Sequence, residues 1–190
     1  MFTQRWPLTA CFVWKNQSPS KNESHSCSLP KRDEWTIHGI WPTKFHTIGP
    51  TYCNRSPFNS STLAPIESEL KENWIDIQQG SKPYSFWKHE WDKHGTCATT
   101  VQALNSEFKY FQVALKLLDQ YNMIDVLAKA NILPGNKYKI QDISMGIQKI
   151  LNKKPQIICV EDNVSSKIIS IQMNIVQIVS FRIKESCTDV

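Results

Sequence analysis

The sequence lacks any long apolar run: no stretch approaches the ~20 consecutive apolar residues that a transmembrane helix needs, so we expect no membrane span. Its opening, Met1 to Pro7, lacks the charged and apolar regions of a signal peptide. Internal repeats and low-complexity tracts are also absent. The 190 residues therefore predict a single domain over 1–190, large enough to bury a substantial core.

The six cysteines include no C-x-x-C pair, which argues against a zinc ribbon or a thioredoxin-type site. An even number of cysteines favours disulfides in an oxidising compartment. Five N-x-S/T sequons predict glycosylation, at Asn16, Asn22, Asn54, Asn59 and Asn163. Together these features predict a glycoprotein that is secreted or resides in the endolysosomal lumen. We therefore expect that a signal peptide has been removed from, or left out of, this sequence.

The chain also lacks a dense basic patch. Its net charge is +5 and its pI about 8.9, a mild bias towards a polyanion that is equally consistent with ordinary solubility. We expect no DNA partner and no cofactor, and we expect a monomer.

The segment 86–97, FWKHEWDKHGTC, concentrates polar chemistry between bulky aromatic residues. Read as a straight α-helix, it places Glu90 and His94 four residues apart on one face, with His89 and Lys93 nearby. Gly95 is then expected to end the helix with a positive φ. The segment could both transfer protons and hold an anion.

A zinc site is disfavoured by the histidine spacing. The zincin motif places its two histidines four apart on one helical face. His89 and His94 are five apart, which separates them by about 140° on a straight α-helix. We therefore predict no metal.

A third histidine, His38, lies in the segment 34–42, which predicts a short strand stopped by Pro42. Cleaving a phosphodiester without a metal requires a base, an acid and positive charge. His38 and His94 could flank a phosphate, with Lys93 and His89 supplying charge. Glu90 would tune His94 or hydrogen-bond the phosphoryl group. In RNA the 2′-hydroxyl serves as the nucleophile, so the protein need supply none.

Periodicity predicts an α+β domain with a central antiparallel sheet and several packed helices. Helices are expected over 64–74, capped by Ser61 and Thr62, and over 106–121, 123–130 and 142–151. Strands are expected over 34–42, 155–159 and 167–184.

The two segments 36–42 (TIHGIWP) and 86–97 resemble the two active-site segments of the ribonuclease T2 family, in the same order and about 50 residues apart. Arg5-Trp6-Pro7 followed by Cys11 is similar to that family's first strand, and the run from Cys53 to Ser56 looks more like its animal members. The resemblance covers about residues 4 to 160, and the chain departs from the family pattern after that.

This resemblance implies an endoribonuclease that cuts single-stranded RNA through a 2′,3′-cyclic phosphate. His38, Glu90 and His94 would be catalytic, with His94 favoured as base and His38 as acid. Lys93 would stabilise the transition state and His89 would hold the phosphate. Trp41 and Phe86 would stack on bases, although a structural role for Trp41 is equally plausible. His25 and His46 are assigned no role.

The resemblance also implies two disulfides, Cys11–Cys27 and Cys53–Cys97, which leaves Cys159 and Cys187 to pair with each other. Arg5 departs from the glutamine or histidine that the family carries before Trp-Pro. Two other functions stay open: a secreted glycoprotein effector that acts by binding, and a zinc hydrolase.

Overall fold

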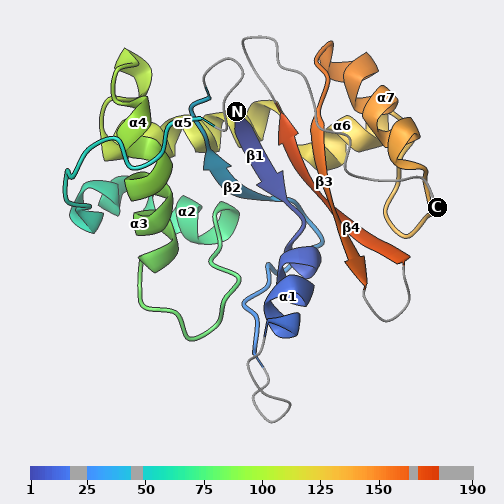
Figure 1. Ribbon diagram of the computed structural model, residues 1–190, viewed down its shortest axis with the longest axis horizontal. Coiled ribbons are helices and arrows are strands. Elements are labelled where there is room, and N and C mark those ends of the chain that lie inside the picture. The colour runs from blue at the N-terminus through green and yellow to red at the C-terminus, as the bar shows by residue number, and fades with distance from the viewer. Residues whose placement is uncertain (18–24, 44–48, 163–166, 176–190) are drawn as a thin grey trace.

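The computed structural model describes residues 1–17, 25–43, 49–162 and 167–175. Its centre is a four-stranded antiparallel sheet of order β2-β1-β4-β3, with helices packed around it (Figure 1). The strands are β1 (Phe2–Arg5), β2 (Thr36–Ile40), β3 (Gln156–Asp162) and β4 (Lys167–Ile175). The predicted α+β class and antiparallel sheet are confirmed. The remainder of the strand expected to Lys184 lies outside the described residues.

One group of helices lies beside β2. These elements are a 3₁₀-helix η1 (Ser60–Ile66), α2 (Glu67–Asn73), α3 (Ser85–Glu90), a π-helical turn η2 (Trp91–Gly95), α4 (Thr96–Ala98) and η3 (Gln102–Leu104). The helix expected over 64–74 therefore begins as a 3₁₀-helix, with Pro65 inside it. Its cap is Asn59, whose side chain accepts from Ser61 N–H, and not Ser61 or Thr62.

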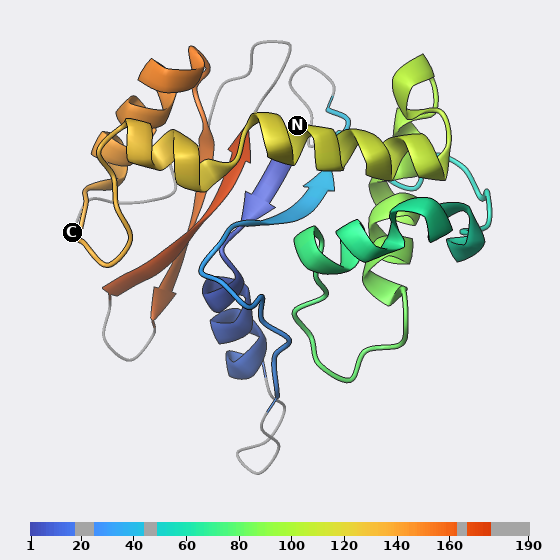
Figure 2. The ribbon, with the colours of Figure 1, turned by 180° about the vertical axis from the view of Figure 1, so that it is seen from behind.

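The remaining helices are α5 (Glu107–Gln120), α6 (Met123–Lys129) and α7 (Ile140–Leu151), close to the predicted ranges. Figure 2 shows α5 and α6 running across the back of the sheet. Tyr110 and Phe111 of α5 are fully buried in a core that also contains Trp74, Trp87 and Trp91. Through this core α5 supports both β2 and the 85–98 segment. No helix in the described part of the chain is long and apolar enough to cross a membrane.

Helix α1 (Pro7–Asn16) is an element that the sequence reading does not anticipate. The family resemblance places the run from Arg5 to Cys11 in a first strand, but β1 ends at Arg5. Pro7 has no N–H for strand pairing, and its fixed φ suits the first turn of a helix. Cys11 consequently lies on a helix.

Candidate active site

His38 occupies a β-bulge. The register between β1 and β2 passes from Thr3↔Gly39 to Gln4↔Ile37, so His38 is the extra residue of β2 at that point. A bulge redirects a side chain and bends its strand. Ile37 stays fully buried while His38 is partly exposed, so the bulge presents the imidazole at the surface of the site without removing the core contacts beside it.

The segment expected as one straight helix is instead α3, the π-turn η2 and α4 in succession. Gly95 has φ −60° and continues the helix to Ala98, so its predicted role as a positive-φ terminator is wrong. A Cβ at Gly95 would lie 2.3 Å from the Trp91 ring. The glycine is needed because the indole of Trp91 packs directly against the backbone there.

The π-turn also changes the angle between His89 and His94. Its hydrogen bonds span five residues, which brings residues five apart closer to one face. The 140° separation was predicted for a straight α-helix, whereas His89 lies in α3 and His94 in the π-turn. Among the described residues, no group of three His, Cys, Asp or Glu side chains is placed to hold a metal ion.

Glu90, the last residue of α3, is 1% exposed, and its carboxylate lies beside His38 of β2. One carboxylate oxygen is 3.7 Å from His38 Nε2, and the other accepts a hydrogen bond of 3.0 Å from Trp41 Nε1. Burial raises the pKa of Glu90 to about 7, against the lowering effects of the Trp41 hydrogen bond and of nearby cations. The carboxylate thus contacts His38 and Trp41, whereas the helical spacing in the sequence suggests His94.

His94 is 8% exposed and stacks on the Trp41 ring, with centroids 5.1 Å apart at 26°. Burial, followed by the positive charges of Lys93 and His89, lowers the pKa of His94 to about 4. The pKa of His89 is also lowered, by burial and then by Lys93. Well above pH 4, His94 is therefore a neutral imidazole with the cationic side chain of Lys93 nearby.

Trp41 is the centre of this arrangement, because its indole contacts all three proposed catalytic residues. The His38 ring lies edge-on to it at 5.0 Å, in addition to the Glu90 bond and the His94 stack. Beside Glu90, a Cβ at Gly39 would meet Glu90 Oε2 at 2.2 Å. Only glycine allows the carboxylate to approach the strand this closely.

Two residues outside the predicted set support the site. The Arg5 guanidinium lies 4.4 Å from the centroid of Phe86 and donates to Ile75 O at 2.6 Å. Burial lowers the pKa of Arg5 to about 10, and its charge lowers that of Glu90. Tyr110 donates to Ile40 O at 2.9 Å, which fixes the end of β2 next to Trp41. For Arg5, the sequence did offer a signal, because an arginine before Trp-Pro departs from the family pattern.

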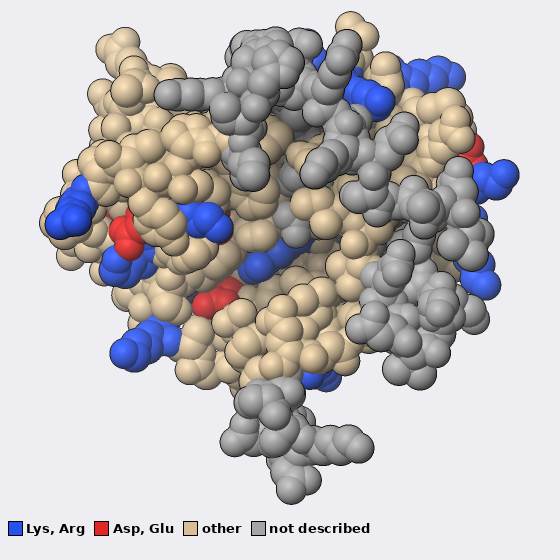
Figure 3. All heavy atoms as spheres, in the orientation of Figure 1, with Lys and Arg blue, Asp and Glu red and all other residues tan. Residues whose placement is uncertain are grey.

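Positive charge on the face drawn in Figure 3 is dispersed. Figure 3 shows basic side chains scattered around and within a hollow on one face, with no continuous basic stripe on the part of that face that the structure describes.

Comparison with known proteins decides the family. The family model described as "Ribonuclease T2 family" matches residues 1–187. The chain belongs to the ribonuclease T2 family. The match extends past residue 160, where the resemblance read from the sequence motifs ends.

Individual relatives agree with this assignment. The chain is 37% identical to ribonuclease Oy of Magallana gigas, over 87% of this chain and 76% of that protein. It is 38% identical to ribonuclease T2 of Homo sapiens over 84% of this chain, but spans only 57% of the human protein. Among solved structures, RNase NT in complex with 5′-AMP is 26% identical with a TM-score of 0.76, covering 98% of this chain and 93% of that one.

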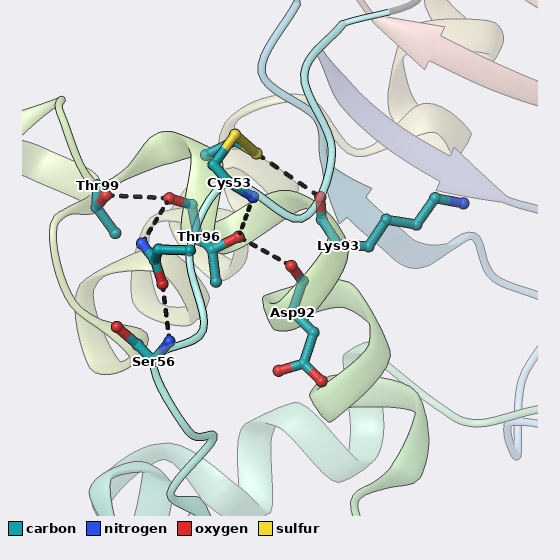
Figure 4. The surroundings of a disulfide bond; sticks show 8 residues. Cys53, Ser56, Asp92, Lys93, Thr96 and Thr99 are labelled. Atoms are coloured by element: carbon teal, nitrogen blue, oxygen red, sulfur yellow. Dashed lines mark hydrogen bonds between the residues drawn. A yellow bond between two sulfur atoms is a disulfide. The ribbon is translucent and has the colours of Figure 1, made fainter.

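Both disulfides that the family resemblance implied are present in the structure. Cys11 bonds to Cys27, and Cys53 bonds to Cys97. The second joins the loop after β2 to the segment that carries His94, as Figure 4 shows. Cys159 lies on β3, but Cys187 lies outside the described residues, so their pairing stays a prediction.

Three of the five sequon asparagines lie in the described part of the chain. Asn16 is exposed at the end of α1, and Asn59 caps η1. Asn54 is exposed, and its Nδ2 donates to Thr96 O at 3.2 Å. Asn22 and Asn163 lie outside the described residues, as does His46. His25 stacks on Trp14 at 3.6 Å, in the loop closed by the first disulfide.

Proposed function

We propose that this chain is an endoribonuclease that cleaves single-stranded RNA by acid–base catalysis, without a metal, through a 2′,3′-cyclic phosphate. The observation that carries the proposal is that two imidazoles, His38 and His94, both contact the ring of Trp41, and that the buried carboxylate of Glu90 lies beside His38. Membership of the ribonuclease T2 family supports the same reaction class.

His94 is assigned as the general base. A base must be unprotonated to accept the proton of the 2′-hydroxyl, and the lowered pKa of His94, about 4, keeps it neutral in mild acid. Lys93, which contributes to that lowering, would place positive charge next to the phosphate as charge develops on it, and His89 would do the same in its protonated form. Lys93 thus assists the transition state and His89 holds the substrate.

His38 is assigned as the general acid that protonates the leaving 5′-oxygen. Its Nε2 lies 3.7 Å from Glu90, whose raised pKa of about 7 lets the pair retain a proton in mild acid. A protonated Glu90 could also donate a hydrogen bond to a phosphoryl oxygen. Activity should therefore fall below about pH 4, where His94 gains a proton, and above about pH 7, where Glu90 loses its proton.

Trp41 and Phe86 are proposed to contact bases of single-stranded RNA, because aromatic stacking is tolerant of sequence. Each has one face already in use, Trp41 against His94 and Phe86 beneath Arg5. Base contacts must then use the remaining face or edge of each ring. Trp41 combines this role with a structural one.

The test is cleavage of single-stranded RNA across pH 3.5 to 8 with EDTA present, with product ends identified by mass spectrometry. His38→Ala and His94→Ala should each lower kcat by at least about 10²-fold, the usual contribution of a proton-transfer group. His25→Ala is the matched control, because that ring lies against Trp14. Loss of activity in EDTA, or near-normal rates in either site variant, would refute the mechanism.

We further propose that the protein works outside the cytosol, in a secreted or endolysosomal setting, where disulfides persist and mild acid suits the two pKa values. Expression in a eukaryotic secretory system followed by enzymatic deglycosylation would test it. The expected result is a mass loss that Asn16→Gln reduces.

A further inference from the structure

Thr96 is fully buried, with 2% of its surface exposed, at the junction of the π-turn and α4. Its backbone N–H bonds to Trp91 O, five residues earlier. In an α-helical register the same N–H would bond to the carbonyl of Asp92, four residues earlier. In the π-register, the backbone N–H of Thr96 therefore does not bond to Asp92 O.

The hydroxyl of the same residue supplies a donor to that carbonyl. Thr96 Oγ1 donates to Asp92 O at 2.8 Å, so one residue satisfies two successive carbonyls of the turn. Buried carbonyls without a donor are costly, by about 1–3 kcal/mol. A residue lacking the hydroxyl would favour a return to the α-register, in which the N–H again bonds to Asp92 O.

Thr96 also joins this turn to the disulfide loop. Its Oγ1 accepts from Cys53 N–H at 3.2 Å, and its carbonyl accepts from Asn54 Nδ2 at 3.2 Å. Tyr52 N–H donates to Lys93 O at 2.9 Å, one residue before His94. Figure 4 shows Thr96 bonded to Cys53 and to Asp92, beside the Cys53–Cys97 bridge.

We propose that Thr96 is a positioning residue for His94. Its hydroxyl stabilises the π-helical hydrogen bonding of the turn, and that backbone conformation places the imidazole against Trp41. Thr96 does not touch the substrate in this proposal. The inference rests on the proposed function only where RNA cleavage rates are used to test it. A one-residue change of register would rotate His94 out of its stack on Trp41 and towards water.

The experiment compares Thr96→Val, which keeps the shape and removes the hydroxyl, with Thr96→Ser, which keeps the hydroxyl. Thr99→Val is the matched control, because its hydroxyl donates to Thr96 O at 3.0 Å, outside the π-turn. For each variant, kcat and KM for RNA cleavage are measured, and the His94 imidazole is titrated by NMR. Thermal unfolding confirms that each variant is folded at the assay temperature.

Thr96→Val should lower kcat at least tenfold with a smaller change in KM, and should move the His94 titration towards the ordinary histidine range. Thr96→Ser and Thr99→Val should remain within about twofold of the parent, with the His94 titration unchanged. An unchanged His94 titration in folded Thr96→Val overturns the proposal. Equal losses in Thr96→Ser also overturn it, because the methyl group would then be responsible.

The two readouts separate this inference from the proposed function. If the parent protein cleaves no RNA, the ribonuclease proposal fails, and the NMR titration still decides whether Thr96 positions His94. If Thr96→Val does not fold, the titration of Thr96→Ala, which leaves a smaller residue and no hydroxyl, provides the same comparison.

Discussion

The indole N–H of Trp41 donates a 3.0 Å hydrogen bond to the buried carboxylate of Glu90. This bond joins the residues just after β2 to the last residue of α3, 49 positions along the chain. It opposes the effect of burial, because it favours the ionised carboxylate and lowers the pKa of Glu90.

Trp41→Phe should shift the alkaline limb of the activity profile upwards. The substitution keeps an aromatic ring for His94 but removes the donor to Glu90, so the pKa of Glu90 rises further and the His38–Glu90 pair keeps its proton to higher pH. We expect a displacement of about 0.5 to 1 pH unit, measured from kcat between pH 5 and 9. A limb that stays in place would mean that the Trp41 bond does not govern the titration of Glu90.

Glu90→Gln should make the stability of the folded protein depend on pH more strongly than it does in the parent. Between pH 4.5 and 7 the folded state holds a proton on Glu90 that the unfolded chain has lost, so stability falls as pH rises. Between pH 4 and 6.5 the unfolded chain holds a proton on His94 that the folded state lacks, so stability rises with pH. Each effect amounts to at most about 3.5 kcal/mol.

Because these contributions oppose each other, urea unfolding of the parent should vary little between pH 4.5 and 6.5 through these two groups. Glu90→Gln should gain stability with pH over that range, and His94→Gln should lose it. Identical slopes in both variants would contradict the pKa assignments. The amide that Glu90→Gln introduces keeps an oxygen that can accept the Trp41 hydrogen bond.

Gly39→Ala should damage the site more than the fold. The added methyl would lie 2.2 Å from Glu90 Oε2 and 2.6 Å from Trp41 Nε1, so both side chains must move. We expect kcat to fall at least tenfold, together with about 1–3 kcal/mol of lost stability from overpacking. Gly135→Ala is the control: its φ of +82° makes alanine unfavourable there, yet no atom within 4 Å would meet the methyl.

Removal of the two disulfides should have different effects on activity. Loops of 44 and 16 residues predict stabilisation of about 4 and about 3 kcal/mol by chain entropy. Replacing Cys53 and Cys97 by serine should reduce both stability and kcat, because that bridge adjoins the π-turn. Replacing Cys11 and Cys27 should reduce the melting temperature alone, when activity is assayed well below it. Equal kinetic losses in the two pairs would contradict a special role for the Cys53–Cys97 bridge.

The sequence alone was sufficient for the elements whose stability is local. Helix α5 follows from its apolar spacing and from Ser106, which caps it by accepting from Lys109 N–H. The candidate site residues were also identified from sequence, because histidine, glutamate and lysine gathered in two short motifs indicate proton transfer and anion binding.

Only the tertiary structure decided how those residues are presented. His38 depends on a bulge against β1, and His94 on a π-turn held by the Cys53 loop; both are single-residue shifts of register that composition and periodicity do not reveal. The opposite pKa shifts of Glu90 and His94 arise mainly from burial, which is set by side chains distant in the chain. The sequence determined which groups are present, and packing determined their protonation.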